Sequence, residues 1–174
     1  MSFIGKGTKG TTYAPGYFLA YGDEDVIRET REISQEGAVT VEDGTKYVPM
    51  GTAYPSNDGN AIGITYEDVD VTTGNMPGSV VTKGIVYEDR LAITGESYDA
   101  VTPVGTENPS EEGWYERSGS AGSYVYTLST DTTVNSEKTY YAKSVVRLAS
   151  AAKTALAALG FKFIASAPAV TRPY

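Results

Sequence analysis

The sequence predicts a mainly β protein with a single α-helix near its C-terminus, an α+β fold. Three observations predict this class. The phrase Gly-Ile-x-Tyr-Glu-Asp, closed by Thr-Gly, occurs twice between residues 61 and 95. The chain is also rich in glycine and tyrosine, with 19 and 14 residues, which favours short strands joined by many turns. Near the end of the chain, one apolar stripe has helical spacing.

The chain is expected to have three parts. Residues 1–16 form a flexible N-terminal arm, residues 17–106 and 144–174 form a compact β-rich core domain that contains the helix, and residues 107–143 form a small aromatic-rich β insertion. A chain of 174 residues has the length of one domain with appendages.

The composition narrows the classes of function. A net charge of −8 disfavours binding to nucleic acid or to an anionic membrane, because phosphate contacts need a basic face. No apolar run has the length of a membrane span, and the first residues lack the apolar core of a signal peptide. The chain has no cysteine and no histidine, which removes disulfides, thiolate metal sites and the commonest general base. We therefore expect a protein made in a cytoplasm that is not an enzyme and needs no cofactor.

The charge is unevenly distributed along the chain. The stretch 22–44 holds eight acidic residues and two arginines, whereas the stretch after Glu137 holds six basic residues and no acid. The two regions are expected to pair within one subunit or to face water. The alternative is that they meet between neighbouring subunits and orient their assembly.

The arm at 1–16 is rich in glycine and threonine and has little to bury. Its stretch 5–10 matches the Gly-x-Gly-x-x-Gly pattern, but no strand precedes it, so nucleotide binding is not expected. An arm that orders on docking, by adding a strand to a partner's sheet, fits this composition better.

Elements of the core domain follow the arm. An apolar patch at 17–21 anchors its base, and the stretch 26–33 fits neither the strand period nor the helix period, so its structure is left open. Asp43-Gly44 between the apolar runs 38–41 and 46–54 predicts a β-hairpin. Pro49 indicates an edge position or a bulge in the second strand of this hairpin.

The doubled phrase predicts a meander of short strands over a shared core. Its copies run from Gly63 to Gly74 and from Gly84 to Gly95. Between them, the stretch 75–78 is a turn signal and 79–83 is a β-branched run. No residue in this region has the spacing of a catalytic motif, so we interpret it as a scaffold.

Three short aromatic strands are predicted in the insertion, at 114–116, 124–128 and 138–142, with turns at 118–123 and 131–136. Their aromatic residues are expected to stack in a small core. The alternative is a sugar-binding surface, because Trp and Tyr offer apolar faces to sugar rings and polar tips to hydroxyl groups. The candidate glycan-facing residues are Trp114, Tyr115, Tyr124 and Tyr126.

The helix is predicted at 146–159, where apolar residues recur on one face. These residues are Leu148, Ala152, Ala155, Leu156 and Leu159. Gly160 is placed to end the helix, and 161–164 predicts a further strand.

Carboxylates of the doubled phrase are the best candidates for paired-acid or metal chemistry. They are Glu67, Asp68, Asp70, Glu88 and Asp89. Pairing of the two copies would bring Asp68 near Asp89, and hard cations favour such oxygen ligands. No calcium-loop spacing is present, and charges on antiparallel strands commonly face water, so we expect no metal site.

Several segments of the sequence resemble the head decoration proteins of tailed bacteriophages, the lambda-type decoration and head fiber proteins. The matching segments are Ala61-Ile62-Gly63-Ile64, Asp70-Val71-Thr72-Thr73-Gly74, Val80-Val81, Gly84-Ile85-Val86 and Asp89-Arg90-Leu91. The late Ala-rich helix, followed by 161–164, is similar to the end of that family, and the likeness covers about half of the chain.

The resemblance implies a virion structural protein, without catalytic residues, that binds the major capsid protein as a homotrimer. It would sit on the outside of the expanded head, near threefold or quasi-threefold axes, and stabilise the shell. Phe3, Ile4, Lys6, Lys9 and Tyr13 would then be the capsid-binding residues of the arm. The chain departs from the family around 22–48 and at 107–143. The alternatives are therefore the capsid-bound base of a head fiber, or an adhesion module that binds a host surface glycan.

Overall fold

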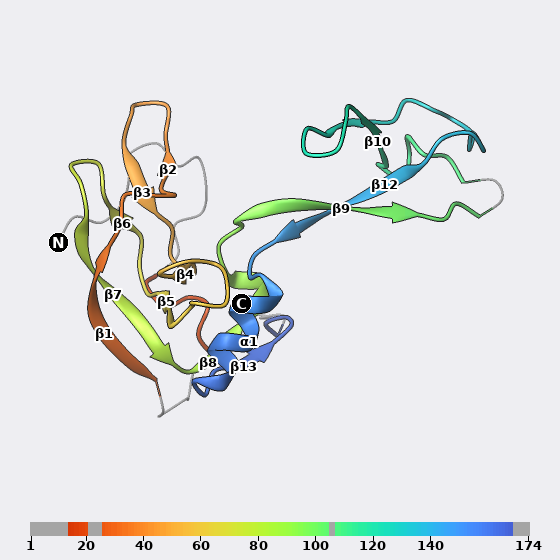
Figure 1. The fold of residues 1–174 in the computed structure, drawn as a ribbon. Coiled ribbons are helices and arrows are strands. Elements are labelled where there is room, and N and C mark those ends of the chain that lie inside the picture. Colours follow the sequence, from red (N-terminus) through yellow and green to blue (C-terminus); the bar gives the residue numbers. More distant parts are fainter. Residues whose placement is uncertain (1–13, 21–25, 105–106, 169–174) are drawn as a thin grey trace, which may run out of the picture. The chain divides into compact units, whose positions relative to one another are not determined.

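The computed structural model describes residues 14–20, 26–104 and 107–168, and it is mainly β with one α-helix near the C-terminus (Figure 1). The predicted fold class is confirmed. The described residues divide into two compact units. Unit 1 is formed by those up to Thr94 together with those from Arg147 onward, and unit 2 is formed by those within Gly95–Val146. The predicted insertion at 107–143 lies inside the second unit, which is larger because it also contains the strand that starts at Gly95.

The first sheet of unit 1 has the strand order β1-β7-β5-β4, with every pair antiparallel. Its strands are β1 (Ile27–Ile33), β7 (Met76–Lys83), β5 (Gly63–Thr65) and β4 (Ala53–Tyr54). The segment that the sequence left open is thus a strand. Apolar periodicity did not reveal it, because six of its seven residues are exposed at the margin of the sheet.

The turn predicted at 75–78 is wrong, since β7 already begins at Met76. Pro77 lies opposite Glu32 of β1, whereas β5 reaches β7 only at Val80 and Val81. A proline is tolerated in a strand where its missing N–H removes no ladder hydrogen bond.

The predicted hairpin is confirmed and belongs to a second sheet of unit 1, with the order β2-β3-β6. Its strands are β2 (Val39–Thr40), β3 (Lys46–Val48) and β6 (Val69–Asp70). In the turn, Thr45 donates its backbone N–H to Asp43 Oδ1 at 2.9 Å. Strand β3 ends before Pro49, and β4 resumes at Ala53, so the predicted second strand is interrupted at the proline.

The two copies of the doubled phrase do not form one meander. The first copy contributes β5 and β6, and the second contributes β8 (Ile85–Tyr87) and the 3₁₀ helix η1 (Glu88–Arg90). Strand β8 pairs in parallel with β13 (Lys162–Ile164), in a sheet separate from that of β5. The same local pattern thus has two different partners, because tertiary packing decides the pairing of short strands.

The predicted helix is confirmed as α1 (Ser150–Ala158), shorter than expected at both ends. Val146 belongs to a strand, and Leu159 follows the helix with 49% of its surface exposed. Of the predicted stripe, Ala152 and Leu156 are fully buried. Gly160 ends the helix as predicted, with φ +99 and its N–H donated to the carbonyl of Ala157 at 3.0 Å.

Unit 1 has two clusters of buried apolar side chains. The larger cluster joins strands of the first sheet to β8, α1 and Phe161, and the smaller one surrounds Ile33 and Val80. The larger cluster consists of Phe18, Ala53, Ala61, Ile64, Val81, Val86, Leu91, Ala152, Leu156 and Phe161.

Unit 2 is a four-stranded antiparallel sheet with the order β11-β10-β12-β9. Its strands are β9 (Gly95–Val101), β10 (Tyr115–Ser118), β11 (Val125–Leu128) and β12 (Tyr140–Val146). The three predicted aromatic strands are confirmed, whereas β9 was not predicted.

The acidic and basic regions of the chain do not pair with each other in the described residues. Glu29 pairs with Arg31 of its own strand, and Lys153 pairs with Glu88 at 2.8 Å. Lys138 and Lys143 pair with acids of unit 2. Among the described residues, no helix is long and apolar enough to cross a membrane.

Candidate functional site

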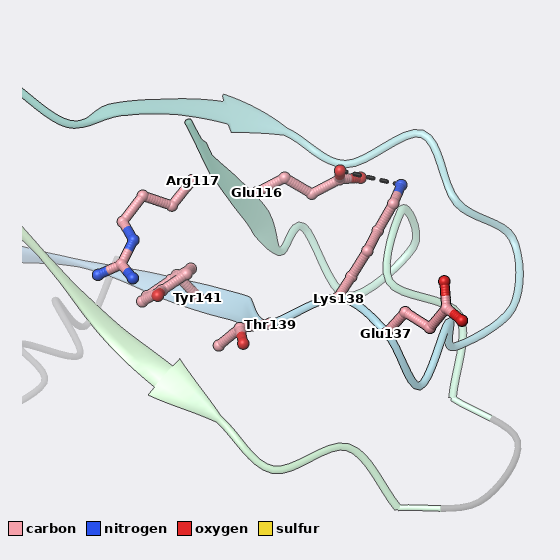
Figure 2. Close-up of a pocket in the computed structure, with 6 residues that line it drawn as sticks. All are labelled: Glu116, Arg117, Glu137, Lys138, Thr139 and Tyr141. Carbon is pink, nitrogen blue, oxygen red and sulfur yellow. Dashed lines mark ion pairs between the residues drawn. The ribbon is translucent and has the colours of Figure 1, made fainter. Parts of the chain in front are cut away.

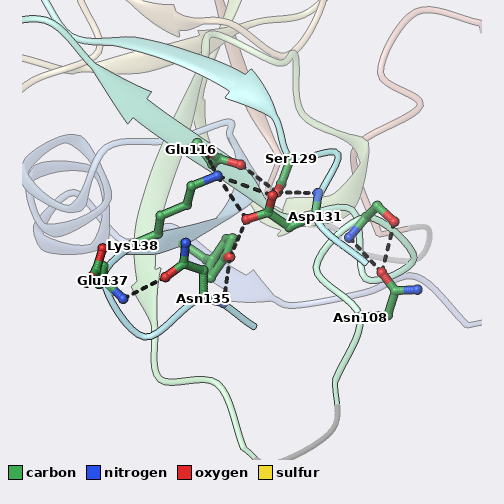
Figure 3. A network of polar contacts seen from close by, with 9 residues as sticks. Asn108, Glu116, Ser129, Asp131, Asn135, Glu137 and Lys138 are labelled. Atoms are coloured by element: carbon green, nitrogen blue, oxygen red, sulfur yellow. Dashed lines mark hydrogen bonds and ion pairs between the residues drawn. The ribbon is translucent and has the colours of Figure 1, made fainter. Parts of the chain in front are cut away.

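A network of polar side chains links the ends of three strands of unit 2 (Figure 3). Lys138 Nζ lies 2.9 Å from Asp131 Oδ2 and 3.0 Å from Glu116 Oε2. The Tyr140 hydroxyl donates to Asp131 Oδ2 at 2.6 Å, and the Ser129 hydroxyl donates to Glu116 Oε1 at 2.7 Å. A single lysine therefore holds two carboxylates that come from different parts of the unit.

The network shifts the pKa of its members in opposite directions. The hydrogen bond from Tyr140 and the contact with Lys138 hold the pKa of Asp131 below its ordinary value. Asp131 and Glu116 raise the pKa of Lys138 above its ordinary value. Burial, followed by the hydrogen bond to Asp131, raises the pKa of Tyr140. These directions keep Asp131, Lys138 and Tyr140 in their ordinary charge states at neutral pH, which suits a structural tie rather than a proton donor or acceptor.

A pocket of about 260 Å³ opens beside this network (Figure 2). It lies where β10 and β12 separate. The two strands share only two pairs of opposite residues, Tyr115 with Tyr141 and Glu116 with Tyr140. Its lining residues are Glu116, Arg117, Glu137, Lys138, Thr139 and Tyr141. In Figure 2 the Glu116–Lys138 ion pair lies at one end and the Arg117 guanidinium, beside Tyr141, at the other.

The basic groups that line the pocket are engaged with neighbouring side chains, so the pocket is better suited to binding a polar group than to catalysing a reaction. Lys138 is already held by two carboxylates, and the Arg117 guanidinium lies 4.2 Å from the ring centre of Tyr124 and 5.0 Å from that of Tyr141. In the described part of the chain, no group of three or more His, Cys, Asp or Glu residues is arranged to hold a metal ion.

One face of the unit 2 sheet carries four tyrosines, which we call the tyrosine face: Tyr98, Tyr115, Tyr126 and Tyr141. Register places them together, because Tyr115 lies opposite Tyr141, Lys143 opposite Tyr98, and Arg117 opposite Tyr126. The rings of Tyr98 and Tyr126 stack with centres 3.9 Å apart and an interplanar angle of 5°. Tyr115 and Tyr141 pack edge-on against this pair, at 5.2 and 5.3 Å.

The predicted glycan-facing residues are divided between two environments. Tyr115 and Tyr126 are half-buried on the tyrosine face, and Tyr124 is 42% exposed beside Arg117. The prediction for Trp114 is wrong. Its side chain is buried, with its ring centre 5.8 Å from that of Tyr140, whose neighbour Tyr141 occupies the tyrosine face.

Sequence reasoning missed Tyr98 as a member of the aromatic cluster, and it placed Tyr141 in an aromatic strand without naming it among the candidate glycan-facing residues. Tyr98 lies in β9, outside the predicted insertion, and it reaches the cluster only through the pairing of β9 with β12. In a strand, Tyr141 and Lys143 lie on the same face, and the sequence shows this spacing. Which residues they contact depends on the neighbouring strands, which the sequence did not identify.

The predicted capsid-binding residues Phe3, Ile4, Lys6, Lys9 and Tyr13 lie outside the described residues.

Carboxylates of the doubled phrase are separated rather than gathered. Asp68 accepts the backbone N–H of Met50 at 2.7 Å, whereas Asp89 accepts that of Ala167 at 3.1 Å. Glu88 binds Lys153. The pairing of the two copies that could bring Asp68 near Asp89 does not occur, because β5 and β8 lie in different sheets.

Comparison of the chain with protein-family models, with curated proteins and with solved structures found no match.

Proposed function

We propose that the chain is a decoration protein of a tailed-bacteriophage head, which binds the outside of the expanded shell as a trimer near threefold or quasi-threefold axes. One observation carries the proposal. Of the resembling segments between residues 61 and 91, Ala61, Ile64, Val81, Val86 and Leu91 pack in one buried cluster. The same cluster contains Ala152 and Leu156 of the late helix α1, and Phe161, which lies just before β13. Most of the resembling segments thus contribute to one core, whereas Val71 and Val80 belong to the smaller cluster.

Physical considerations support a role of this kind. In a cyclic trimer, three modest contacts act together, so that attachment is tight without a large interface per subunit. A protein that binds only the expanded shell stabilises that state by linkage. The chain would be made in the host cytoplasm and act on the exterior of the virion, with the major capsid protein as its partner.

Sedimentation with undecorated expanded heads tests this proposal. We expect the purified chain to pellet with the heads and to saturate at a fixed ratio to the major capsid protein. Unexpanded heads are the matched control and are expected to leave the chain in the supernatant. A chain that stays in the supernatant with both kinds of head contradicts the proposal.

A second candidate function is binding of a host surface glycan through unit 2. The observation in its favour is that Tyr115 and Tyr126 share one face of a sheet, with Tyr124 exposed beside them. Stacking with Tyr98 already covers one face of the Tyr126 ring, which favours a packing role for that residue. The two functions make opposite predictions for the removal of unit 2.

Deletion of residues 95–146 separates the two candidates. The Thr94 hydroxyl lies 3.2 Å from the Arg147 carbonyl oxygen, so a short glycine linker can join the flanking residues within unit 1. A decoration protein retains head binding after this deletion, whereas a glycan-binding module loses binding to host cells. Loss of head binding by a deletion variant that keeps the unfolding transition of unit 1 would contradict attachment through unit 1.

A further inference from the structure

The outer edge of β1 is unpaired in the described part of the chain. Strand β1 pairs with β7 on one side and stands at the end of the strand order of its sheet (Figure 1). All of its residues except Ile33 are exposed. An edge of seven residues offers a row of backbone donors and acceptors to another strand.

Pro77 shows which residues of β1 direct their backbone N–H and C=O groups away from β7, toward the unpaired edge. In an antiparallel ladder, hydrogen-bonded and non-hydrogen-bonded pairs alternate. Pro77 has no N–H to donate, so its pair with Glu32 is a non-hydrogen-bonded one. The backbone groups of Glu32 therefore point away from β7, and by alternation so do those of Thr30 and Arg28.

The sequence of β1 is complementary to itself in the antiparallel direction. It is Ile27-Arg28-Glu29-Thr30-Arg31-Glu32-Ile33. When two copies are related by a twofold axis at Thr30, each Arg28 lies opposite a Glu32, each Glu29 opposite an Arg31, and each Ile27 opposite an Ile33. Thr30 meets Thr30 in the centre, with its outward backbone groups in position for the first pair of hydrogen bonds.

The charges on one face of this pair would form a closed square. Glu29 and Arg31 already form an ion pair within β1, with their side chains 45% and 43% exposed. Since residues two apart share a face, Glu29 and Arg31 of a second copy would lie beside them with the signs exchanged. Each charge would then have one opposite charge along its strand and another across the pair.

Other arrangements of the two strands place like charges together. A shift by two residues brings Arg31 opposite Arg31, or Glu29 opposite Glu29. Parallel in-register pairing brings every charge opposite its own sign. A shift by one residue exchanges the two faces of one strand. Electrostatics thus specify one register and one direction.

Charged side chains on an edge strand commonly serve to prevent pairing. The charges of β1 would disfavour pairing with a strand of a different charge pattern, but they favour antiparallel pairing with a second copy of β1. By contrast, β11, one of the two edge strands of the unit 2 sheet, carries no charged residue in Val125–Leu128.

We propose that β1 is an interface between two copies of this chain, which pair antiparallel about Thr30. The result is a continuous sheet with the order β4-β5-β7-β1-β1-β7-β5-β4. Such an interface is isologous and twofold, so it differs from the threefold contact of the proposed trimer and would link one trimer to the next. It does not depend on capsid binding.

Disulfide cross-linking at the twofold axis tests the geometry. The chain has no cysteine, so Thr30→Cys introduces the only thiol. Hydrogen-bonded partners in an antiparallel pair have Cα atoms about 5.5 Å apart, which lies within the range of roughly 4.4–6.8 Å that a disulfide spans. We expect mild oxidation to convert T30C mainly to a covalent dimer.

Thr40→Cys is the matched control, because Thr40 is also an exposed strand residue of unit 1. We expect T40C to remain mainly monomeric on a reducing-agent-free gel. Equal cross-linking of T30C and T40C would overturn the proposal.

Charge exchange tests the chemistry of the interface. The variant R28E/R31E has an entirely acidic edge, and E29R/E32R has an entirely basic one. Each alone is expected to raise the dissociation constant of the twofold contact by roughly tenfold to a hundredfold, because four attractive cross-strand pairs become repulsive. An equimolar mixture of the two is expected to restore association, measured by sedimentation velocity.

The control for net charge is E36R/E42R, which changes the charge as E29R/E32R does but at exposed residues outside β1. It is expected to associate as the original chain does. If the acidic and basic variants associate no better together than alone, the pairing is not the one proposed. Head sedimentation is measured on the same variants, and its outcome bears only on the decoration role.

Discussion

The two units of this chain are stabilised by different kinds of interaction. In unit 1, the buried clusters consist largely of aliphatic side chains, among them Ile64, Val81 and Leu156. In unit 2, the buried hydrophobic residues of the described chain are aromatic: Trp114, Tyr140 and Tyr141. A small unit buries little apolar surface, so polar ties and ring contacts contribute more to its stability.

The contrast indicates where each unit is sensitive. Aliphatic packing in unit 1 responds to changes of volume, whereas the network around Asp131 in unit 2 responds to changes of proton binding. The chain offers a selective probe, since its single tryptophan is Trp114, buried in unit 2. Tryptophan fluorescence therefore reports the unfolding of unit 2, and far-UV circular dichroism reports the whole chain.

Leu156→Ala is expected to have the largest effect. Leu156 is fully buried in the larger cluster of unit 1, and removal of such a side chain costs about 2–5 kcal/mol in the free energy of unfolding. Thermal unfolding by circular dichroism measures this loss, and the Trp114 transition is expected to be unchanged. Leu159→Ala, at a half-exposed position just beyond the helix, is the control. Equal loss in both signals would mean that the two units unfold together.

Thr65→Val tests the main buried polar residue of unit 1. Thr65 is 1% exposed, and its hydroxyl donates to the Pro49 carbonyl at 2.8 Å and accepts the Thr52 N–H at 2.9 Å. Substitution removes these two hydrogen bonds, each of which contributes about 0.5–1.5 kcal/mol to the free energy of unfolding, while the Pro49 carbonyl keeps the Thr52 hydroxyl as a donor at 2.7 Å. Urea unfolding measures the change, with Thr40→Val at an exposed strand position as control. A loss no larger than that of the control would show that the hydroxyl is dispensable.

The sequence predicted the individual helix and strands of this fold better than it predicted which strands pair with each other. The hairpin at Asp43-Gly44, the helix with buried Ala152 and Leu156, and the aromatic strands of unit 2 all follow from local patterns. Strand β9 has the sequence Gly-Glu-Ser-Tyr-Asp-Ala-Val, which lacks an apolar face and so gave no signal. The doubled phrase gave a clear local signal but led to a wrong prediction of one meander, because a local repeat does not specify which strands pair.

The candidate site was predicted only in part. Tyr115, Tyr124 and Tyr126 were singled out by composition, and β pairing adds Tyr98 and Tyr141. Trp114 was misplaced because the side of a sheet on which a residue lies depends on register, which the sequence did not determine.

Because the Asp131 network lies in unit 2, its protonation should make the stability of unit 2 depend on pH. The pKa of Asp131 is lowered in the folded state, so the folded state binds fewer protons than the unfolded state in acid. Its stabilisation is present above the unfolded pKa of about 3.9 and is lost as pH falls through the lower folded pKa. The raised pKa values of Lys138 and Tyr140 have the opposite consequence, with stability lost as pH rises above about 10.

We expect Asp131→Asn to flatten the acid part of the stability profile of unit 2, measured by Trp114 fluorescence in urea at a series of pH values. Glu137→Gln, which also removes one carboxylate from this part of the chain, is the control. An acid profile unchanged by D131N would exclude Asp131 as its origin.

Glu88→Gln is expected to have the smallest effect. The ion pair of Glu88 with Lys153 in unit 1 is partly exposed, with side-chain exposures of 29% and 44%. Exposed ion pairs contribute about 0–1 kcal/mol, so a small shift of the circular dichroism midpoint is expected, and 0.5 M salt should reduce it, since added salt screens such pairs. A loss as large as that of T65V would place the pair among the main determinants of the unit.

Cryo-electron microscopy of expanded heads, saturated with the chain and compared with the same heads left bare, tests the decoration role most directly. We expect added density in groups of three on the outer surface, at the threefold or quasi-threefold axes. Heads that remain identical to the bare ones, at concentrations where the chain is folded, would contradict the proposed function.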